Sequence, residues 1–300
     1  MAIDWSGIYH ILATPFLDDG TLDAEGLPRL VDAVLRSGVT GITILGIAGE
    51  AHRLTDDERR RVVDGVVKEV RGRVPVAVGV SAPGTHLASG FAVMAREHGA
   101  DAVMVAPPSG ARNLDAVAEY YQAVAAAARL PVVLQDEPVT TQVVMPAAFL
   151  ARLVAEVDAA QAVKLEEAPT PPKITRLRAL VSRPIPIFGG LGGVYFFEEL
   201  SRGAVGAMTG FPYPEALRMI HEHFVAGRRN EARSVFYQWL PLIRYESQPG
   251  SVPGTSMAIR KEILRRRGWI RSARVRPPAT PLDAATLEEL TEIMTAVGTA

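Results

Sequence analysis

The chain repeats one pattern of apolar and polar positions. A short run of β-branched and other apolar residues is followed by a longer segment whose apolar residues have helical spacing. Short apolar runs bounded by Gly, Pro or Asp are typical of buried strands. The pattern therefore predicts eight strands, at 8–14, 41–46, 75–80, 101–106, 131–136, 161–166, 184–190 and 204–210.

Amphipathic segments between and after these runs predict the helices. Polar cap residues and a closing glycine mark the first two, at 23–38 and 55–72. The other helices are expected at 114–129, 146–156, 171–181, 191–202 and 213–226, and beyond the last strand at 229–245, 254–268 and 283–297.

The alternation of strand and helix predicts the fold class. Eight β/α units within residues 1–226 fit the size and rhythm of a (β/α)8 TIM barrel. Residues 227–300 are then a C-terminal helical extension. A doubly wound open sheet is the alternative, but no strand is followed by the Gly-x-Gly-x-x-Gly turn with which that fold binds dinucleotides.

Composition narrows the classes of function. The formal net charge is −1 and the chain contains no cysteine, which argues against nucleic-acid binding and excludes thiol catalysis and cysteine-ligated metals. His221 and His223 are two apart on a predicted helix and face different directions, so no metal site is predicted. We find no signal-peptide pattern and no apolar run of the roughly 18 residues that a membrane span needs. We therefore expect a cytoplasmic protein without a membrane partner.

The most informative residue is Lys164, one of only four lysines in the chain. It lies in the sixth predicted strand, and because strand side chains alternate, Glu166 shares its face. In a (β/α)8 barrel the reactive groups project from the carboxyl ends of the strands. A lysine amine removed from water can attack a carbonyl carbon and form a Schiff base. The alternative is an exposed strand end at which Lys164 pairs with Glu166 or Glu167.

Further candidate residues follow the other strands. Gln135 shares a face with Val133, and its amide either contacts a substrate oxygen or is a core amide satisfied by the backbone. The turn Gly46–Gly49 offers the backbone N–H groups of Ile47 and Ala48 to a carboxylate. The residues expected to bind substrate are Gly46, Ile47, Ala48, Ser109, Asp136, Gly189, Gly190 and Thr209.

Taken together, these features resemble a known family. The turn Gly46–Glu50, the downstream L-T-D-D-E-R at 54–59, the lysine ending the sixth strand and the glycine ending the seventh are similar to motifs of the dihydrodipicolinate synthase and N-acetylneuraminate lyase family. The resemblance covers essentially the whole chain. It implies a (β/α)8 barrel, a Schiff base at Lys164, a homo-oligomer of two or four copies, and no metal or organic cofactor.

The chain departs from that family's usual pattern around the expected site. Two threonines of the family's turn are replaced by Ile47 and Ala48, and the tyrosine of the fifth strand is replaced by Gln135. A second tyrosine corresponds to Ser109, and an arginine after the fifth strand corresponds to Thr140. The family's hydroxyl relay for protons is therefore missing, which argues against dihydrodipicolinate synthesis.

Four segments resemble a divergent branch of the family, the 2-keto-3-deoxy-pentonate dehydratases, which include the 2-keto-3-deoxy-L-arabonate dehydratases. These segments are V-L-Q-D-E-P (133–138), K-L-E (164–166), G-A-M-T-G-F-P (206–212) and Y-Q-W-L-P-L-I (237–243). In that branch the glutamate two residues after the lysine is implicated in proton transfer, which corresponds to Glu166.

The expected function is that of a lyase acting on a small hydroxylated 2-oxo acid, with Lys164, Glu166 and Gln135 as catalytic residues. A 2-keto-3-deoxy sugar acid dehydratase is the first interpretation. The same iminium could instead support a pyruvate-type aldolase or a synthase-like condensation. From another class, a barrel that has lost catalysis could bind small molecules as a sensor, although the presence of both Lys164 and Glu166 argues against it.

Overall fold

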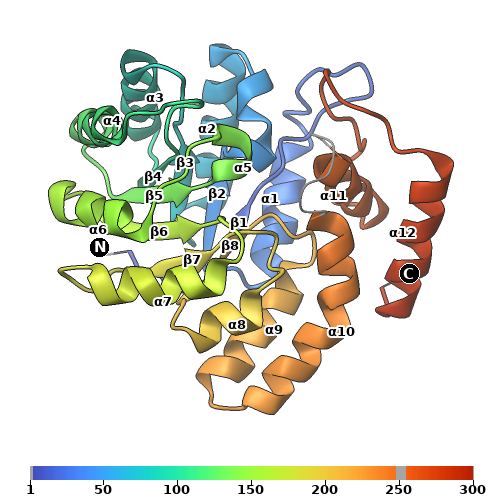
Figure 1. Cartoon of the computed structure of the whole chain (residues 1–300). Helices are drawn as coiled ribbons and strands as arrows, with labels where there is room; N and C mark the ends of the chain where they lie inside the picture. Colours follow the sequence, from blue (N-terminus) through green and yellow to red (C-terminus); the bar gives the residue numbers. More distant parts are fainter. Residues whose placement is uncertain (1–2, 248–254, 300) are drawn as a thin grey trace.

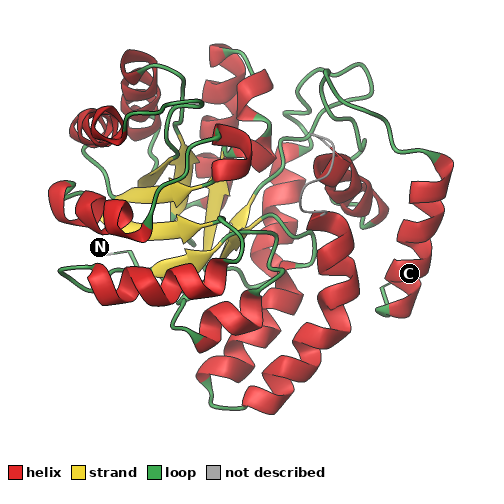
Figure 2. Ribbon diagram, in the orientation of Figure 1, coloured by secondary structure: helices red, strands yellow, loops and turns green. Residues whose placement is uncertain are grey.

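The computed structural model describes residues 3–247 and 255–299, and a closed barrel of eight parallel strands lies at its centre. Each strand pairs with the next one in the chain, and β1 pairs with β8 to close the barrel. Figure 2 shows these strands enclosed by helices. The predicted (β/α)8 barrel is confirmed. The strands are β1 (Gly7–Ile11), β2 (Gly41–Ile44), β3 (Val76–Gly79), β4 (Ala102–Val105), β5 (Val132–Asp136), β6 (Ala160–Leu165), β7 (Ile187–Gly189) and β8 (Gly206–Thr209).

Helices follow every strand and form the outer layer of the barrel (Figure 1). They are α1 (Leu27–Arg36), α2 (Asp56–Val70), α3 (Thr85–Glu97), α4 (Leu114–Ala128), α6 (Ala147–Glu156), α7 (Thr170–Leu180), α8 (Phe196–Ser201) and α9 (Pro214–Val225). Three short helical turns lie in loops after strands, namely η1 (Ile47–Gly49), η2 (Ala51–Arg53) and α5 (Pro138–Thr141).

Some elements differ from the predicted ones. Helix α3 and the turn α5 were not among the predicted helices. Helix α8 begins later than the expected residue 191, because Gly192 and Gly193 have φ values of 60° and 90° that a right-handed helix cannot contain. Strand β7 is shorter than predicted, since Pro184 and Pro186 have no N–H to donate to a strand ladder.

The barrel interior is filled by side chains that alternate along the strands. A cluster of buried residues that includes Val133, Ala162, Phe188 and Met208 occupies it. Because successive strand residues face opposite sides, the residues two positions further along face inward at the carboxyl end. Those residues are Gln135, Lys164, Gly190 and Gly210.

Three further helices follow the barrel, α10 (Arg229–Ser247), α11 (Thr255–Arg266) and α12 (Ala284–Ala296). The predicted helix start at residue 254 lies outside the described residues. Helix α10 packs against α9, α11 and α12, so a division of the chain between residues 226 and 227 stays a prediction. None of the helices in residues 3–247 and 255–299 is long and apolar enough to cross a membrane.

Candidate active site

Lys164 ends β6 and lies at the carboxyl mouth of the barrel. Its side chain is 3% exposed, and its Nζ contacts Oε1 of Glu166. Both side chains line a pocket of about 160 Å³, together with residues from β1, the β2–α2 turn, β5, the β7–α8 loop, β8, α10 and α11. The pairing of Lys164 with Glu166 therefore occurs inside the barrel mouth and not at an exposed strand end. The amine and the carboxylate are thus close enough for Glu166 to exchange a proton with the nucleophile.

Gln135 is brought beside this pair by the register of two strands. It is directly opposite Lys164 in the β5–β6 ladder. Its Nε2 donates a 2.9 Å hydrogen bond to Oε1 of Glu166. The same carboxylate oxygen thus contacts the lysine amine and the glutamine amide, which fixes its orientation. The prediction that these three side chains meet is confirmed.

The two glycines that follow Phe188 face opposite sides of β7. A Cβ at Gly190 would lie 2.5 Å from Cγ of Glu166 and 2.7 Å from Cε of Lys164, so only glycine leaves room for this pair. A Cβ at Gly189 would instead overlap the carboxylate of Glu199 on α8. The placement of Gly189 at the substrate site was therefore wrong, because strand alternation turns it toward the outer helices.

The turn after β2 contributes two residues to the lining of the same pocket. Ile47 and Ala48 line it, and within the described parts of the chain their N–H groups have no hydrogen-bond acceptor. Glu50, which follows the turn with φ of 54°, is buried and contacts Nζ of Lys261 on α11 at 2.5 Å. The C-terminal helices thus hold the turn in place. Two adjacent N–H groups without an acceptor, in residues that line one pocket, can bind a carboxylate.

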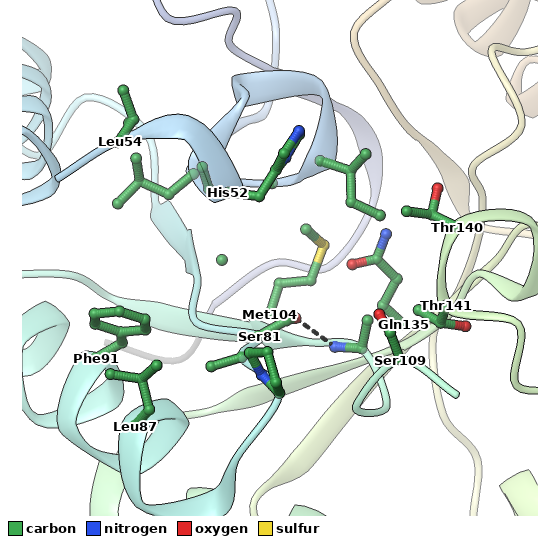
Figure 3. A pocket seen from close by; sticks show the side chains of 18 of the residues that line it. His52, Leu54, Ser81, Leu87, Phe91, Met104, Ser109, Gln135, Thr140 and Thr141 are labelled. Atoms are coloured by element: carbon green, nitrogen blue, oxygen red, sulfur yellow. Dashed lines mark hydrogen bonds between the residues drawn. The ribbon is translucent and has the colours of Figure 1, made fainter. Parts of the chain in front are cut away.

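A larger cavity of about 600 Å³ adjoins the lysine pocket and shares Ile47 and Gln135 with it. Figure 3 shows Gln135, Ser109 and Thr140 at one end of this cavity and Phe91 at the other. Ser109 and Gly46 line this cavity but not the pocket of Lys164. The expectation that Ser109 lies close to the lysine amine was therefore wrong.

Asp136 is the other residue that the structure places elsewhere. Its buried carboxylate lies on the outer face of β5 and contacts Nζ of Lys173 on α7 at 2.6 Å. Asp136 lies between two residues of the pocket, Gln135 and Glu137, and strand alternation turns it away from them. This ion pair fixes α7 to the barrel and does not reach the pocket. Thr209, by contrast, lines the pocket with Lys164 as predicted.

Two charged residues of the pocket were not among the predicted site residues. Glu137 follows Gln135 by two positions, so the alternation that selected Gln135 could also have indicated Glu137. Arg260 comes from α11, far from the strands in sequence. No pattern in the sequence indicates that this helix reaches the barrel mouth.

Glu137 titrates within the physiological range. Its side chain is buried, and burial, followed by the negative charge of Glu166, raises the pKa of Glu137 to about 7. Two hydrogen bonds from the backbone N–H of Thr140, at 3.0 and 3.2 Å, oppose this shift. A carboxyl group with this pKa can take up or release a proton near neutral pH, which suits acid–base catalysis.

The raised pKa makes stability depend on pH. A carboxyl whose pKa rises from 4.5 to about 7 on folding favours the folded state below pH 4.5, and this contribution is lost as the pH rises through 7. The difference corresponds to about 3 kcal/mol. Between pH 5 and 8 we expect the melting temperature of Glu137→Gln to fall less than that of the unmodified protein. Glu97→Gln changes a carboxylate at an exposed helical position, so this variant should show the same fall in melting temperature with pH as the unmodified protein. Identical profiles for all three proteins would contradict the assignment.

Comparison with known proteins agrees with this architecture. The family profile described as "Dihydrodipicolinate synthetase family" matches residues 4–297. The chain belongs to the dihydrodipicolinate synthetase family. It is therefore an enzyme, a lyase of the class I aldolase type that this family comprises.

Individual members of the dihydrodipicolinate synthetase family are similar to the chain over nearly its full length. An L-2-keto-3-deoxyarabonate dehydratase of Azospirillum brasilense is 32% identical over 96% of this chain and 93% of its own. A 4-hydroxy-tetrahydrodipicolinate synthase of Parabacteroides distasonis is 28% identical, covering 97% of each chain. The crystal structure of a dihydrodipicolinate synthase from Rhodopseudomonas palustris superposes with a TM-score of 0.90, at 35% identity and 97% coverage of both chains.

Proposed function

We propose that this protein dehydrates a 2-keto-3-deoxy sugar acid through a Schiff base at Lys164. The contact of Lys164 with Glu166, held by Gln135 inside one small pocket, is the observation that carries the proposal. A pocket of about 160 Å³ suits a small acid, since pockets that bind drug-sized ligands measure roughly 300–1,000 Å³. The 32% identity to an L-2-keto-3-deoxyarabonate dehydratase supports the same substrate class.

The first step joins the substrate to the enzyme. The unprotonated amine of Lys164 attacks the carbonyl carbon C2, and the carbinolamine loses water to give an iminium. Glu166 contacts the amine, so its carboxylate can accept the proton that the ammonium releases and then give it to the carbinolamine hydroxyl, which leaves as water and leaves Glu166 ionised for the next step. The C1 carboxylate of the substrate would bind the N–H groups of Ile47 and Ala48, two residues that line the same pocket.

The second step removes water from the substrate. The iminium draws electrons from the C3–H bond, and Glu166 takes the proton to leave an enamine. The enamine electrons then expel the C4 hydroxyl, which leaves as water after accepting that proton from Glu166. Hydrolysis of the resulting unsaturated iminium returns Lys164 and restores the C2 carbonyl. Thr209 lines the pocket and can orient a substrate hydroxyl, and Glu137 can exchange a proton with Glu166. No step is assigned to a cofactor.

The assembly and location of the protein also belong to the proposal. A homo-oligomer of two or four copies in the cytoplasm would agree with a family in which oligomers are common. Sedimentation of the purified protein measures this directly, and a monomer at micromolar concentration would contradict it.

Two assays test the proposed reaction against its main alternative. We expect the unmodified protein to release water from a 2-keto-3-deoxy pentonate, measured as loss of the substrate and appearance of the dehydrated 2-oxo acid. We expect no comparable condensation of pyruvate with aspartate semialdehyde, because Ile47 and Gln135 carry no hydroxyl group. Efficient condensation without dehydration would show that the protein is a synthase.

A further inference from the structure

Arg260 brings a second cation into the lysine pocket from a different part of the chain. It lies on α11 and lines the pocket beside Thr209, Gly210 and Ile11, at the ends of β8 and β1. Lys164 stands on β6, with β7 between β6 and β8. The two cations therefore approach the pocket from different sectors of the barrel mouth.

The guanidinium of Arg260 is hydrogen-bonded through its Nε, while its two Nη atoms remain available to a ligand. Its Nε donates a 2.5 Å hydrogen bond to Oε1 of Glu246 on α10, a carboxylate that is 0% exposed. In residues 3–247 and 255–299 the Nη atoms have no hydrogen-bond acceptor. A Cβ at Gly210 would lie 2.5 Å from Nη1 of Arg260, so glycine is needed there for the guanidinium to take this position.

The charge and the geometry of the free Nη donors indicate what they bind. Burying an arginine against a buried carboxylate costs several kcal/mol of desolvation, and a neutral side chain would suffice to bind a hydroxyl group. The Nη pair of a guanidinium matches the two oxygens of a carboxylate and donates charge-assisted hydrogen bonds to it. The C1 carboxylate of a 2-oxo acid already has the N–H groups of Ile47 and Ala48. Arg260 is thus available for a second carboxylate.

We propose that Arg260 binds a carboxylate at the far end of the substrate, so that the preferred substrates are 2-oxo acids with two carboxylates. This inference rests on the proposed function, in which C2 is joined to Lys164 and C1 is bound at the turn after β2. The remaining carbons then extend across the mouth toward β8 and α11. Ser247 and Ser256 line that part of the pocket and can bind hydroxyl groups of the intervening carbons. The substrate class becomes the 2-keto-3-deoxy sugar diacids.

The test compares two acids of equal length, 2-oxopentanedioate and 2-oxopentanoate. Each is incubated with the protein and cyanoborohydride, and the second-order rate of adduct formation at Lys164 is measured by mass spectrometry. We expect the unmodified protein to prefer the diacid at least tenfold. Loss of a charge-assisted pair should lower this preference about ten- to a hundredfold in Arg260→Gln. Arg260→Lys, which keeps the charge without the planar fork, should retain part of it.

Controls separate the role of Arg260 from a structural one. Arg265→Gln removes a charge from the same helix, where the guanidinium pairs with Glu262 outside the pocket, and should leave the preference unchanged. If Arg260→Gln unfolds because Glu246 loses its partner, Glu246→Gln combined with Arg260→Gln restores a neutral buried pair and is measured instead.

The outcomes distinguish this inference from the proposed function. Equal trapping of both acids by the unmodified protein, or an equal loss for both acids in Arg260→Gln, overturns the distal carboxylate but leaves the Schiff base standing. An equal loss for both acids would indicate that Arg260 binds the C1 carboxylate, which both acids carry. If neither acid labels Lys164, the proposed function fails. Calorimetric titration with pentanedioate and pentanoate then still tests Arg260, and equal affinities for the two would overturn its assignment.

Discussion

Replacing Lys164 with methionine should abolish turnover, with a loss on the order of 10⁵-fold or more. Methionine has nearly the length of lysine and fills the buried position beside Phe188 and Gly190, but it has no amine to attack C2. Without the iminium, C3–H is far less acidic and the C4 hydroxyl has no electron pair to expel it. The measurement is the initial rate of dehydration of a 2-keto-3-deoxy acid, corrected for the uncatalysed rate.

The same substitution at another lysine shows whether the loss of turnover is specific to position 164. Lys68 is an exposed residue of α2 and does not line the pocket of Lys164. Lys68→Met should keep turnover within about twofold, as is usual for exposed positions. Circular dichroism should show Lys164→Met folded. If folded Lys164→Met retains a substantial rate, dehydration does not proceed through this amine.

Changing Glu166 to glutamine should lower turnover by about 10²–10⁴-fold, the range over which general acid–base catalysis typically contributes. Glutamine preserves the volume of the side chain in the tight space beside Gly190 and can still contact Gln135. It cannot accept the proton from C3 or return one to the leaving hydroxyl. The lysine amine remains in place, so covalent trapping at Lys164 should persist in this variant even when turnover is lost, although more slowly because Glu166 no longer accepts the proton of the amine.

Glu167→Gln provides the comparison for Glu166. Glu167 is the next residue in the chain, but its carboxylate contacts Lys173 and does not line the pocket. We expect its turnover to stay within a few-fold of that of the unmodified protein. Undiminished dehydration by Glu166→Gln would show that another group of the pocket transfers the proton. Glu137 would then be the next carboxyl to substitute.

The sequence could predict this site where it depends on local periodicity. Alternation along β5 and β6 brings Gln135, Lys164 and Glu166 to one face, and the parallel barrel then places them at the same mouth. Alternation also turns Asp136 and Gly189, each one position from a pocket residue, toward the outer helices, and it brings Glu137, two positions after Gln135, to the pocket. The end of a strand therefore contributes residues to both faces of the barrel wall, and only one face belongs to the site.

Arg260 could not be predicted in this way. Its place in the pocket depends on how α10 and α11 pack after the last strand, and periodicity within one helix does not determine that packing. The pairing with Glu246 and the close approach to Gly210 join segments that are distant in the chain. The late start of α8 has a simpler cause in Gly192 and Gly193, where two residues with positive φ outweigh the amphipathic pattern around them.

Identification of the labelled lysine tests the central claim most directly. The unmodified protein is incubated with a 2-keto-3-deoxy acid and borohydride, digested, and mapped by mass spectrometry. We predict one reduced adduct, at Lys164, and none at Lys68, Lys173 or Lys261, because only Lys164 lines the pocket with Glu166 and Gln135. An adduct on any of the other three lysines, or no adduct across a panel of 2-oxo acids, would contradict the Schiff-base mechanism.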